Sequence, residues 1–272
     1  MTTALPPSFT DVRVRYPVQT FCFDGEDWTV RDTGGAQDGA PPLVLLPGAL
    51  GTGDVFYRLM AELGHRRRLI SITYPAIGEA RMLARGVVHV MEALGLSTVH
   101  LLGTSLGGYV AQIVAMESSA RLRKLILANT FYDPALQQAR WPAVEIYAQS
   151  SPEDILAAAR TQLEQAPEPT SRHAELKAVM LHLVGAEQDA RAVKAMRLAV
   201  LTAMPLPAVP LPAQAIALID DDEDPVIASP TREQMRQRYA SSPLFRIPGG
   251  GHYPANLQPE RYRAAIEDFL AS

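Results

Sequence analysis

The chain has 272 residues, of which 47% are hydrophobic and 20% are charged. This apolar content can offset the entropy lost on folding, so it excludes a disordered chain and favours one large domain or a core with an insertion. The 25 basic residues against 29 acidic residues give a net charge of −4. Because no basic stripe occurs along the chain, nucleic acid is not an expected partner.

The cysteine content and the N-terminal sequence limit the cellular compartments in which we expect the protein. Cys22 is the only cysteine, which excludes an internal disulfide and a cysteine-based metal cluster. Residues 1–17 contain neither the basic region nor the apolar core of a signal peptide. No apolar run reaches the roughly 18 residues that a membrane-spanning helix needs. We therefore expect a soluble, cytoplasmic protein with no membrane span.

The first part of the chain, residues 1–132, alternates strand-like and helix-like segments. Asp24 and Gly25 form a turn signal that joins two predicted strands as a hairpin, and Asp54 is placed to cap a predicted helix. Strands separated by single helices pair in parallel through right-handed crossovers, so we expect a layered α/β sheet. The predicted strands are 18–23, 28–31, 43–46, 69–74, 99–102 and 124–128, and the predicted helices are 54–63, 80–94 and 109–116.

The pattern changes between residues 133 and 205, where the sequence predicts amphipathic helices and no strand. These helices are expected at 139–149, 152–165, 171–184 and 188–203, and a proline-rich connector follows them. Strands at 215–219 and 244–247 then alternate with helices at 232–239 and 259–270. We expect a core formed by residues 1–132 and 212–272, interrupted by a helical cap at 133–211. Such a cap would cover the carboxyl edge of the sheet, where ligands bind.

The sequence Gly103-Thr104-Ser105-Leu106-Gly107 lies between a predicted apolar strand and a predicted helix. A serine between glycines at such a junction occupies a tight, strained turn that directs its hydroxyl away from the sheet. Its backbone lies at a helix N-terminus, where N–H groups and the helix dipole favour negative charge. Ser105 is therefore the candidate nucleophile, and a glycine-rich turn without chemistry is the alternative interpretation.

An activated serine needs a base, and His252 is the best placed of the six histidines. It directly follows a predicted strand in Gly249-Gly250-Gly251-His252, a loop that can carry an imidazole over the sheet edge. The alternative for His252 is a glycine-rich loop with an incidental histidine. The remaining histidines lie in a predicted polar turn, in helices or in a strand, where a structural role is more common; they are His65, His89, His100, His173 and His182.

The acid that would orient this base is expected in the run from Asp220 to Asp224, just past a predicted strand. Most carboxylates in such a run are solvated, but one of them stands where the acid belongs in the chain order Ser, Asp, His. Asp224 is favoured, because Pro225 biases its backbone towards an extended conformation. Asp222 is the second candidate, and Asp133, before the helical insertion, is the third.

Two backbone N–H groups are expected to stabilise the oxyanion that forms during the reaction. One is the N–H of Leu106, which follows the candidate nucleophile. The second is expected in the loop Pro47-Gly48-Ala49-Leu50-Gly51-Thr52-Gly53, after the strand at 43–46, and Ala49 is the candidate donor. Because both donors are main-chain groups, the identity of these side chains matters little.

The order and spacing of these motifs resemble the α/β-hydrolase fold superfamily over essentially the whole chain. The resemblance rests on Gly103-x-Ser105-x-Gly107 between strand and helix, on the late Asp224, and on Gly251-His252 near the C-terminus. It implies an α/β-hydrolase fold with a mostly parallel central sheet flanked by helices and a helical cap inserted before the late strands. It also implies a Ser-His-Asp triad with an oxyanion hole.

Roughly the first half of the chain is similar to maspardin and its bacterial relatives. The similar segments are Arg15-Tyr16-Pro17, the loop from Pro47 to Phe56, and Gly103 to Tyr109. Many superfamily members have His-Gly before the oxyanion residue, whereas this chain has Pro47-Gly48, a departure that bears on substrate positioning rather than on a backbone donor. Maspardin resembles a non-catalytic binding member that lacks the triad histidine, whereas this chain retains His252.

The sequence therefore predicts a serine hydrolase for a carboxylic ester, thioester or lactone, which acts through an acyl-enzyme without a metal or organic cofactor. The alternatives are a carbon–carbon bond hydrolase or a cofactor-free haloperoxidase- or lyase-like enzyme on the same scaffold, and a non-catalytic maspardin-like binding protein. Apolar side chains in the cap indicate a small-molecule substrate with an apolar acyl or ring moiety, although packing between cap helices is the simpler explanation for most of them. These side chains are Leu156, Met180, Leu183, Met196 and Leu198.

Overall fold

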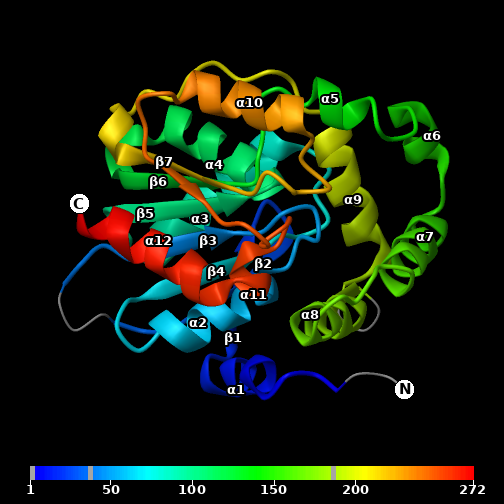
Figure 1. Cartoon of the computed structure of the whole chain (residues 1–272), viewed down its shortest axis with the longest axis horizontal. Helices are drawn as coiled ribbons and strands as arrows, with labels where there is room; N and C mark the ends of the chain where they lie inside the picture. Colours follow the sequence, from blue (N-terminus) through cyan, green and yellow to red (C-terminus); the bar gives the residue numbers. More distant parts are fainter. Residues whose placement is uncertain (1–3, 36–38, 185–187) are drawn as a thin grey trace.

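A sheet of eight strands forms the centre of the described structure, with helices on both of its faces (Figure 1). The computed structural model describes residues 4–35, 39–184 and 188–272; residues 1–3, 36–38 and 185–187, within the predicted N-terminal, core and cap segments, lie outside the described residues. The strands lie in the order β1-β2-β4-β3-β5-β6-β7-β8. Their bounds are β1 Val18–Phe23, β2 Glu26–Asp32, β3 Leu43–Leu46, β4 Leu69–Thr73, β5 Val99–Thr104, β6 Leu122–Ala128, β7 Ile216–Asp220 and β8 Leu244–Arg246.

The direction of the strands sets the position of the site. The strands β4, β3, β5, β6, β7 and β8, which are neighbours in that order, pair in parallel. At the other side of the sheet, β1 pairs with β2 and β2 pairs with β4 in the antiparallel direction. The β1–β2 hairpin turns at Asp24 and Gly25, whose φ angles of 54° and 77° suit a two-residue turn. The predicted hairpin and the predicted α/β fold with a mostly parallel sheet are therefore confirmed. Parallel pairing brings the carboxyl ends of β3, β5, β7 and β8 to one edge of the sheet.

Twelve α-helices of the described residues surround this sheet. None of them combines the length and the apolar composition that crossing a bilayer demands. Their bounds are α1 Pro7–Arg15, α2 Tyr57–Leu63, α3 Ala80–Ala93, α4 Leu106–Glu117, α5 Ala135–Gln138, α6 Val144–Gln149, α7 Pro152–Glu164, α8 Ser171–His182, α9 Ala190–Leu201, α10 Ser229–Arg238, α11 Pro254–Leu257 and α12 Pro259–Ala271.

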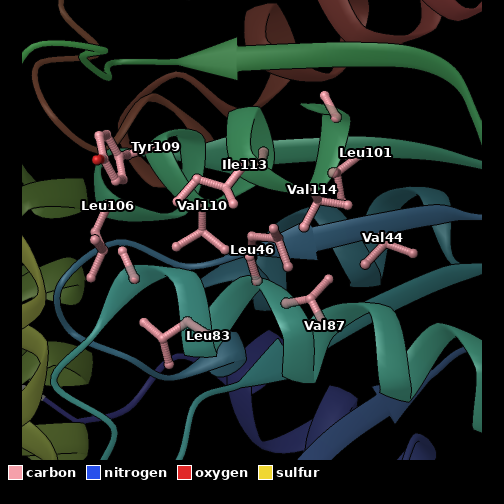
Figure 2. Packing of buried hydrophobic residues seen from close by; sticks show 14 of the residues in the cluster. Val44, Leu46, Leu83, Val87, Leu101, Leu106, Tyr109, Val110, Ile113 and Val114 are labelled. Atoms are coloured by element: carbon pink, nitrogen blue, oxygen red, sulfur yellow. The ribbon is translucent and has the colours of Figure 1, made fainter. Parts of the chain in front are cut away.

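The core lies on both faces of the sheet, and β3 contributes to each half. Val44 and Leu46 belong to a cluster shared with α3 and α4, whereas Leu43 and Leu45 belong to one shared with α2 and α12. Figure 2 shows side chains of α3 and α4 packed around Leu46. All four side chains are fully buried, and each buried aliphatic side chain of this size stabilises the fold by about 1.5–3 kcal/mol. A continuous apolar run therefore forms this strand, as expected for a strand covered on both faces.

The helices α5 to α9 follow β6 and precede β7, where the sequence predicts the helical insertion. Figure 1 shows α9 alongside one end of the sheet. A Cβ atom on Gly51, in the loop after β3, would lie 3.0 Å from Met196 Cγ of α9. A Cβ atom on Gly78, in the loop after β4, would lie 3.3 Å from Leu198 Cβ of the same helix. The helix α9 therefore packs directly on loops at the carboxyl edge of the sheet.

Three of the apolar side chains that suggested an apolar substrate are packed into the core. Met180 and Leu183 belong to the cluster on the α2 side of the sheet, and Met196 belongs to the cluster on the α4 side. Each of them is at most 2% exposed. Packing between helices therefore explains these three side chains.

Several local predictions differ from the structure. The segment predicted as a helix over 54–63 begins as a 3-10 helix at Gly53–Phe56 and becomes α-helical only at Tyr57. Thr52 caps it instead of Asp54, because Thr52 Oγ1 accepts a hydrogen bond from the Asp54 N–H at 3.2 Å. The helix predicted over 139–149 is confined to Val144–Gln149. The sequence patterns do not predict α1 or the short helix α11.

Candidate active site

Ser105 occupies a strained turn between β5 and α4. Its backbone angles are φ 54° and ψ −123°, a region that a non-glycine residue occupies only when its surroundings enforce it. The Ser105 carbonyl oxygen accepts hydrogen bonds from the Gly108 N–H at 3.0 Å, from the Tyr109 N–H at 3.2 Å and from Thr130 Oγ1 at 2.6 Å. The Ser105 N–H donates to the Ala128 carbonyl at 3.0 Å. These four hydrogen bonds fix the strained conformation.

The glycines at 103 and 107 allow this turn to form. A Cβ atom on Gly103 would lie 2.2 Å from the Gly107 carbonyl oxygen, a distance that no side chain tolerates. A Cβ atom on Gly107 would lie equally close, 2.2 Å, to the carbonyl oxygen of Leu46 at the end of β3. The spacing Gly-x-Ser-x-Gly therefore lets the first turn of α4 rest directly on the ends of two strands.

The loop that follows β3 contacts Ser105. A Cβ atom on Gly48 would lie 3.0 Å from Ser105 Cβ, so the backbone next to Ala49 rests against the candidate nucleophile. Among the residues that the structure describes, the N–H groups of Ala49 and Leu106 donate no hydrogen bond, and Ser105 Oγ has no hydrogen-bond partner. The predicted oxyanion donors are therefore near the predicted nucleophile, and no hydrogen bond among the described residues occupies them.

The structure brings His252 and Asp224 together. His252 Nδ1 lies 2.9 Å from Asp224 Oδ2, and the Asp224 side chain is completely buried. The other carboxylate oxygen of Asp224 accepts the N–H groups of Val226 at 2.7 Å and of Ile227 at 3.0 Å. A carboxylate held in this way fixes the imidazole ring and favours the tautomer with its proton on Nδ1, which leaves Nε2 as the proton acceptor.

The other two candidate acids have different partners. Asp222 is half exposed and forms ion pairs with Arg236 at 2.6 Å and Arg246 at 3.4 Å. The hydrogen bond from Arg236 lowers the pKa of the Asp222 carboxyl. Asp133 accepts a hydrogen bond from the Ala135 N–H at 3.0 Å, which starts α5. The structure therefore brings Asp224, and neither of these two, to His252.

The remaining histidines lie on elements other than the loops at the carboxyl edge. His89 is in α3 and stacks on Phe23 at 4.5 Å between ring centroids, and His100 is a buried residue of β5. His65 is exposed in a turn, as the sequence indicates. His173 and His182 belong to α8.

Asn129, Asp221 and Arg232 hold the loops of the site, and the sequence patterns do not single them out for this role. Asn129 Nδ2 donates to the Gly251 carbonyl at 2.7 Å, and Asp221 Oδ2 accepts the Gly251 N–H at 2.7 Å. The buried guanidinium of Arg232 donates to the carbonyls of Asp222, Asp224 and Ile227. The signal for Asn129 is its place directly after β6, where its φ of 42° is uncommon for a residue other than glycine.

Within the described ranges, no three His, Cys, Asp or Glu side chains are grouped so that they could hold a metal ion.

Two curated relatives cover different shares of the chain. Over 143 residues the chain is 34% identical to maspardin from Homo sapiens, a match that covers 50% of this chain and 46% of maspardin. The chain thus spans about half the length of the first curated relatives it matches. It is also 23% identical over 250 residues to the putative carbamate hydrolase RutD from Caulobacter vibrioides, covering 87% of this chain and 93% of that protein.

Solved structures share the fold along nearly the whole chain. A hydrolase from Pseudomonas aeruginosa superposes with a TM-score of 0.71 and 20% identity, covering 94% of this chain and 99% of its own. A thermophilic esterase from Thermogutta terrifontis gives a TM-score of 0.71 and 23% identity, covering 93% of this chain and 97% of its own. At these identities the likeness shows a common fold.

The sequence match to a family model extends from β3 into α12. The model of the alpha/beta hydrolase family matches residues 43–265, a range that includes Ser105, Asp224 and His252. The order of strands, the strained serine after β5 and the late histidine are consistent with that match. The chain belongs to the alpha/beta hydrolase family.

Proposed function

We propose that the protein is a serine hydrolase that cleaves a carboxylic ester, thioester or lactone through an acyl-enzyme on Ser105. The observation that carries this proposal is the hydrogen bond of 2.9 Å between buried Asp224 and His252, on loops at the same sheet edge as the strained Ser105. A buried carboxylate bound to an imidazole at this edge has a direct use in activating a serine hydroxyl.

The proposed reaction begins with attack of Ser105 Oγ on the substrate carbonyl carbon, while His252 Nε2 takes the hydroxyl proton. The negative charge that develops on the carbonyl oxygen is stabilised by the N–H groups of Ala49 and Leu106. When the tetrahedral intermediate collapses, the bond to the leaving group breaks and His252 gives its proton to that group. Water, deprotonated by His252, then attacks the acyl-enzyme and releases the acid and Ser105. Asp224 stabilises the charged imidazole in both halves of the reaction, and no cofactor is required.

The helices α5 to α9 form the cap of the proposed enzyme, with the insertion between residues 133 and 211. Contacts of α9 with Gly51 and Gly78 support this assignment, because both loops follow strands at the carboxyl edge. The Tyr109 hydroxyl also donates to the Met204 carbonyl at 2.5 Å, which ties α4 to the end of the insertion. Ser105 and His252 are each 8% exposed, as expected for side chains that lie beneath a cap.

A maspardin-like binding protein is the second candidate function. The 34% identity to maspardin over 143 residues, which is 50% of this chain, favours it. Asp224 and His252 both lie in the late part of the chain, and their buried hydrogen bond supports catalysis instead.

Turnover of a panel of p-nitrophenyl esters, thioesters and lactones of increasing acyl length tests the proposal. We expect the wild-type protein to hydrolyse at least one of them, and Ser105→Ala and His252→Ala to lose this activity while remaining folded. Ser241→Ala, at an exposed serine, is the control and should keep full activity. Full activity in Ser105→Ala would show that the mechanism is wrong, and turnover by none of the compounds would favour the binding protein.

A further inference from the structure

Arg197 of α9 is an unusual arginine in this chain. Its side chain is half-buried, yet within the described part of the chain its guanidinium forms neither a hydrogen bond nor an ion pair. Other half-buried or buried arginines have such partners: Arg31 contacts Asp54 at 2.6 Å, and Arg236 contacts Asp220 at 2.8 Å. One turn before Arg197, Lys194 also donates to the carbonyls of Ala148 and Ser150, at 2.7 and 2.9 Å.

An aromatic ring contacts the guanidinium of Arg197. The guanidinium carbon lies 4.7 Å from the centroid of Trp141, in the segment that leads into α6. Trp141 in turn stacks on Tyr147 at 6.3 Å between centroids, and it packs against the core cluster on the α4 side. A ring face attracts a cation but accepts none of the five N–H bonds that an arginine can donate. Trp141 therefore fixes the guanidinium in place and leaves its donors available.

The neighbours of Arg197 in sequence place this part of α9 at the carboxyl edge of the sheet. Met196 lies against the loop that carries Ala49 and Gly51, and Leu198 lies against Gly78. The helix thus covers the carboxyl edge of the sheet directly on either side of Arg197. Because the main chain at 196–198 is held against these loops, the position of Arg197 is fixed by packing as well as by Trp141.

The charge of Arg197 acts on Tyr253, the residue that follows His252. The ring of Tyr253 is edge-on to His252, with 5.1 Å between centroids. Burial raises the pKa of the Tyr253 hydroxyl, the charge of Arg197 lowers it, and the charge of Asp224 raises it. The guanidinium and the Asp224 carboxylate therefore both act on one side chain beside His252.

We propose that Arg197 binds a carboxylate of the substrate, so that the compound cleaved at Ser105 carries a second, ionised carboxyl group. This inference rests on the proposed function and names its substrate class: half-esters, thioesters or lactones derived from acids with a free carboxylate. A guanidinium is planar and donates two parallel hydrogen bonds to a carboxylate. The carboxylate also carries a negative charge that neutralises the guanidinium, whereas the Trp141 ring is uncharged. The alkyl chain between the two carbonyl groups of such a substrate is apolar, which suits the Trp141 ring beside the Arg197 guanidinium.

A matched pair of esters tests the proposal: p-nitrophenyl valerate and the mono-p-nitrophenyl ester of glutaric acid. Both have five-carbon acyl chains, and only the second ends in a carboxylate. We expect the wild-type protein to prefer the glutarate ester, and Arg197→Met to lower kcat/KM for that ester at least tenfold, mainly through KM. The same variant should change kcat/KM for the valerate ester less than twofold, and Arg197→Lys should recover part of the loss because it keeps the charge.

The control is Arg191→Met on the same helix, where the guanidinium is 78% exposed and pairs with Asp189 at 3.0 Å. We expect this variant to behave as wild type with both esters. Equal changes in both esters in Arg197→Met, or no preference for the glutarate ester in the wild type, would overturn the proposal.

A binding measurement separates this proposal from the proposed function. Calorimetric titration with glutarate should show binding to Ser105→Ala and at least tenfold weaker binding to the Ser105→Ala, Arg197→Met double variant. If no ester is cleaved but this difference is found, the hydrolase proposal fails and the carboxylate site stands. If esters are cleaved but glutarate binding is the same in both proteins, the carboxylate site is wrong and the hydrolase proposal stands.

Discussion

At the scale of single residues, the site depends on carboxylates that stand close together in sequence but differ in their partners, although Asp220 and Asp222 share Arg236. Asp220 pairs with Arg236 at 2.8 Å, Asp221 accepts the Gly251 N–H at 2.7 Å, and Asp222 pairs with Arg236 at 2.6 Å. Asp224 alone of this run contacts His252 in the described structure. The contacts of each carboxylate therefore depend on a partner that lies 14 or more residues further along the chain.

Replacing the acids one at a time by asparagine tests this division. In Asp224→Asn the amide faces His252 Nδ1 and favours the tautomer whose Nε2 carries the proton, so kcat should fall about 1,000-fold or more. Asp222→Asn should change kcat less than threefold, because Asp222 is half exposed and pairs only with arginines. Steady-state hydrolysis by the two variants, with circular dichroism to confirm folding, makes the comparison. Similar losses in both would contradict the assignment.

The sequence predicts the positions of Ser105 and His252 better than that of the acid. Glycines on both sides of Ser105 are needed for local packing, so the signal lies within five residues of the chain. The choice between Asp222 and Asp224 depends on Arg236 and His252, whose positions relative to the acidic run are set by the sheet. The third candidate, Asp133, contacts the start of α5. Proline after Asp224 is a correct but weak local signal for the residue that meets His252.

At the scale of elements, Arg232 of α10 organises the loop that carries Asp224. Its guanidinium is buried and donates to three backbone carbonyls, those of Asp222, Asp224 and Ile227. Among the described residues, this loop between β7 and α10 contains no helix or strand. The conformation of the acid loop therefore depends on a side chain from the helix that follows it.

Arg232→Met should lower the free energy of unfolding by about 3 kcal/mol, because three backbone carbonyl groups, two of them in buried hydrogen bonds, lose a charged donor worth about 1 kcal/mol or more each. Gln237→Met is the matched control, since Gln237 is exposed on the same helix, and it should change stability by less than about 0.5 kcal/mol. Urea denaturation of the three proteins gives the values. Equal stability of Arg232→Met and wild type would show that the loop is held by other contacts.

The segment after the loop at 47–53 is helical as predicted, but its cap is not the predicted residue. An aspartate before an apolar run is typical of a helix cap, and Asp54 fits that pattern. In the structure Arg31 of β2 binds Asp54 with two hydrogen bonds, at 2.6 and 3.1 Å, and both side chains are buried. The carboxylate is thus used in a tertiary ion pair, and the neighbouring Thr52 provides the cap.

At the scale of the whole molecule, apolar runs and turn residues predict every strand of the described sheet, but they do not predict the order of the strands. The run at 43–46 is bounded correctly, because a strand buried on both faces must be apolar throughout. The neighbours of β3 in space are β4 and β5, whereas β2 pairs with β4. That order depends on contacts between distant segments, and it carries no signal in a local sequence window.

His100 makes the stability of the whole fold depend on pH. Burial, followed by the charges of Arg67, Lys124 and Arg123, lowers the pKa of His100 to about 4. The folded protein therefore holds this side chain neutral, and its unfolded state takes up a proton at higher pH than the folded state. Stability linked to His100 is full above pH of about 6.5 and is lost as the pH falls towards 4.

His100→Gln should remove this part of the pH dependence. At about 1.4 kcal/mol per pKa unit, the wild-type protein should lose about 3 kcal/mol more than the variant between pH 7 and pH 4. Urea denaturation of both proteins across this pH range measures their free energies of unfolding. Carboxylate titrations are common to both proteins, so their contributions cancel in the difference. Parallel stability curves for the two proteins would contradict the role of His100.

Covalent labelling shows whether Ser105 is a nucleophile that His252 and Asp224 activate. Intact-mass analysis after treatment with a fluorophosphonate should show one adduct on the wild-type protein and on Ser241→Ala. The adduct should be absent from Ser105→Ala and formed far more slowly by His252→Ala and Asp224→Asn. No adduct on the folded wild-type protein, or an adduct that persists in Ser105→Ala, would show that Ser105 is not the activated nucleophile.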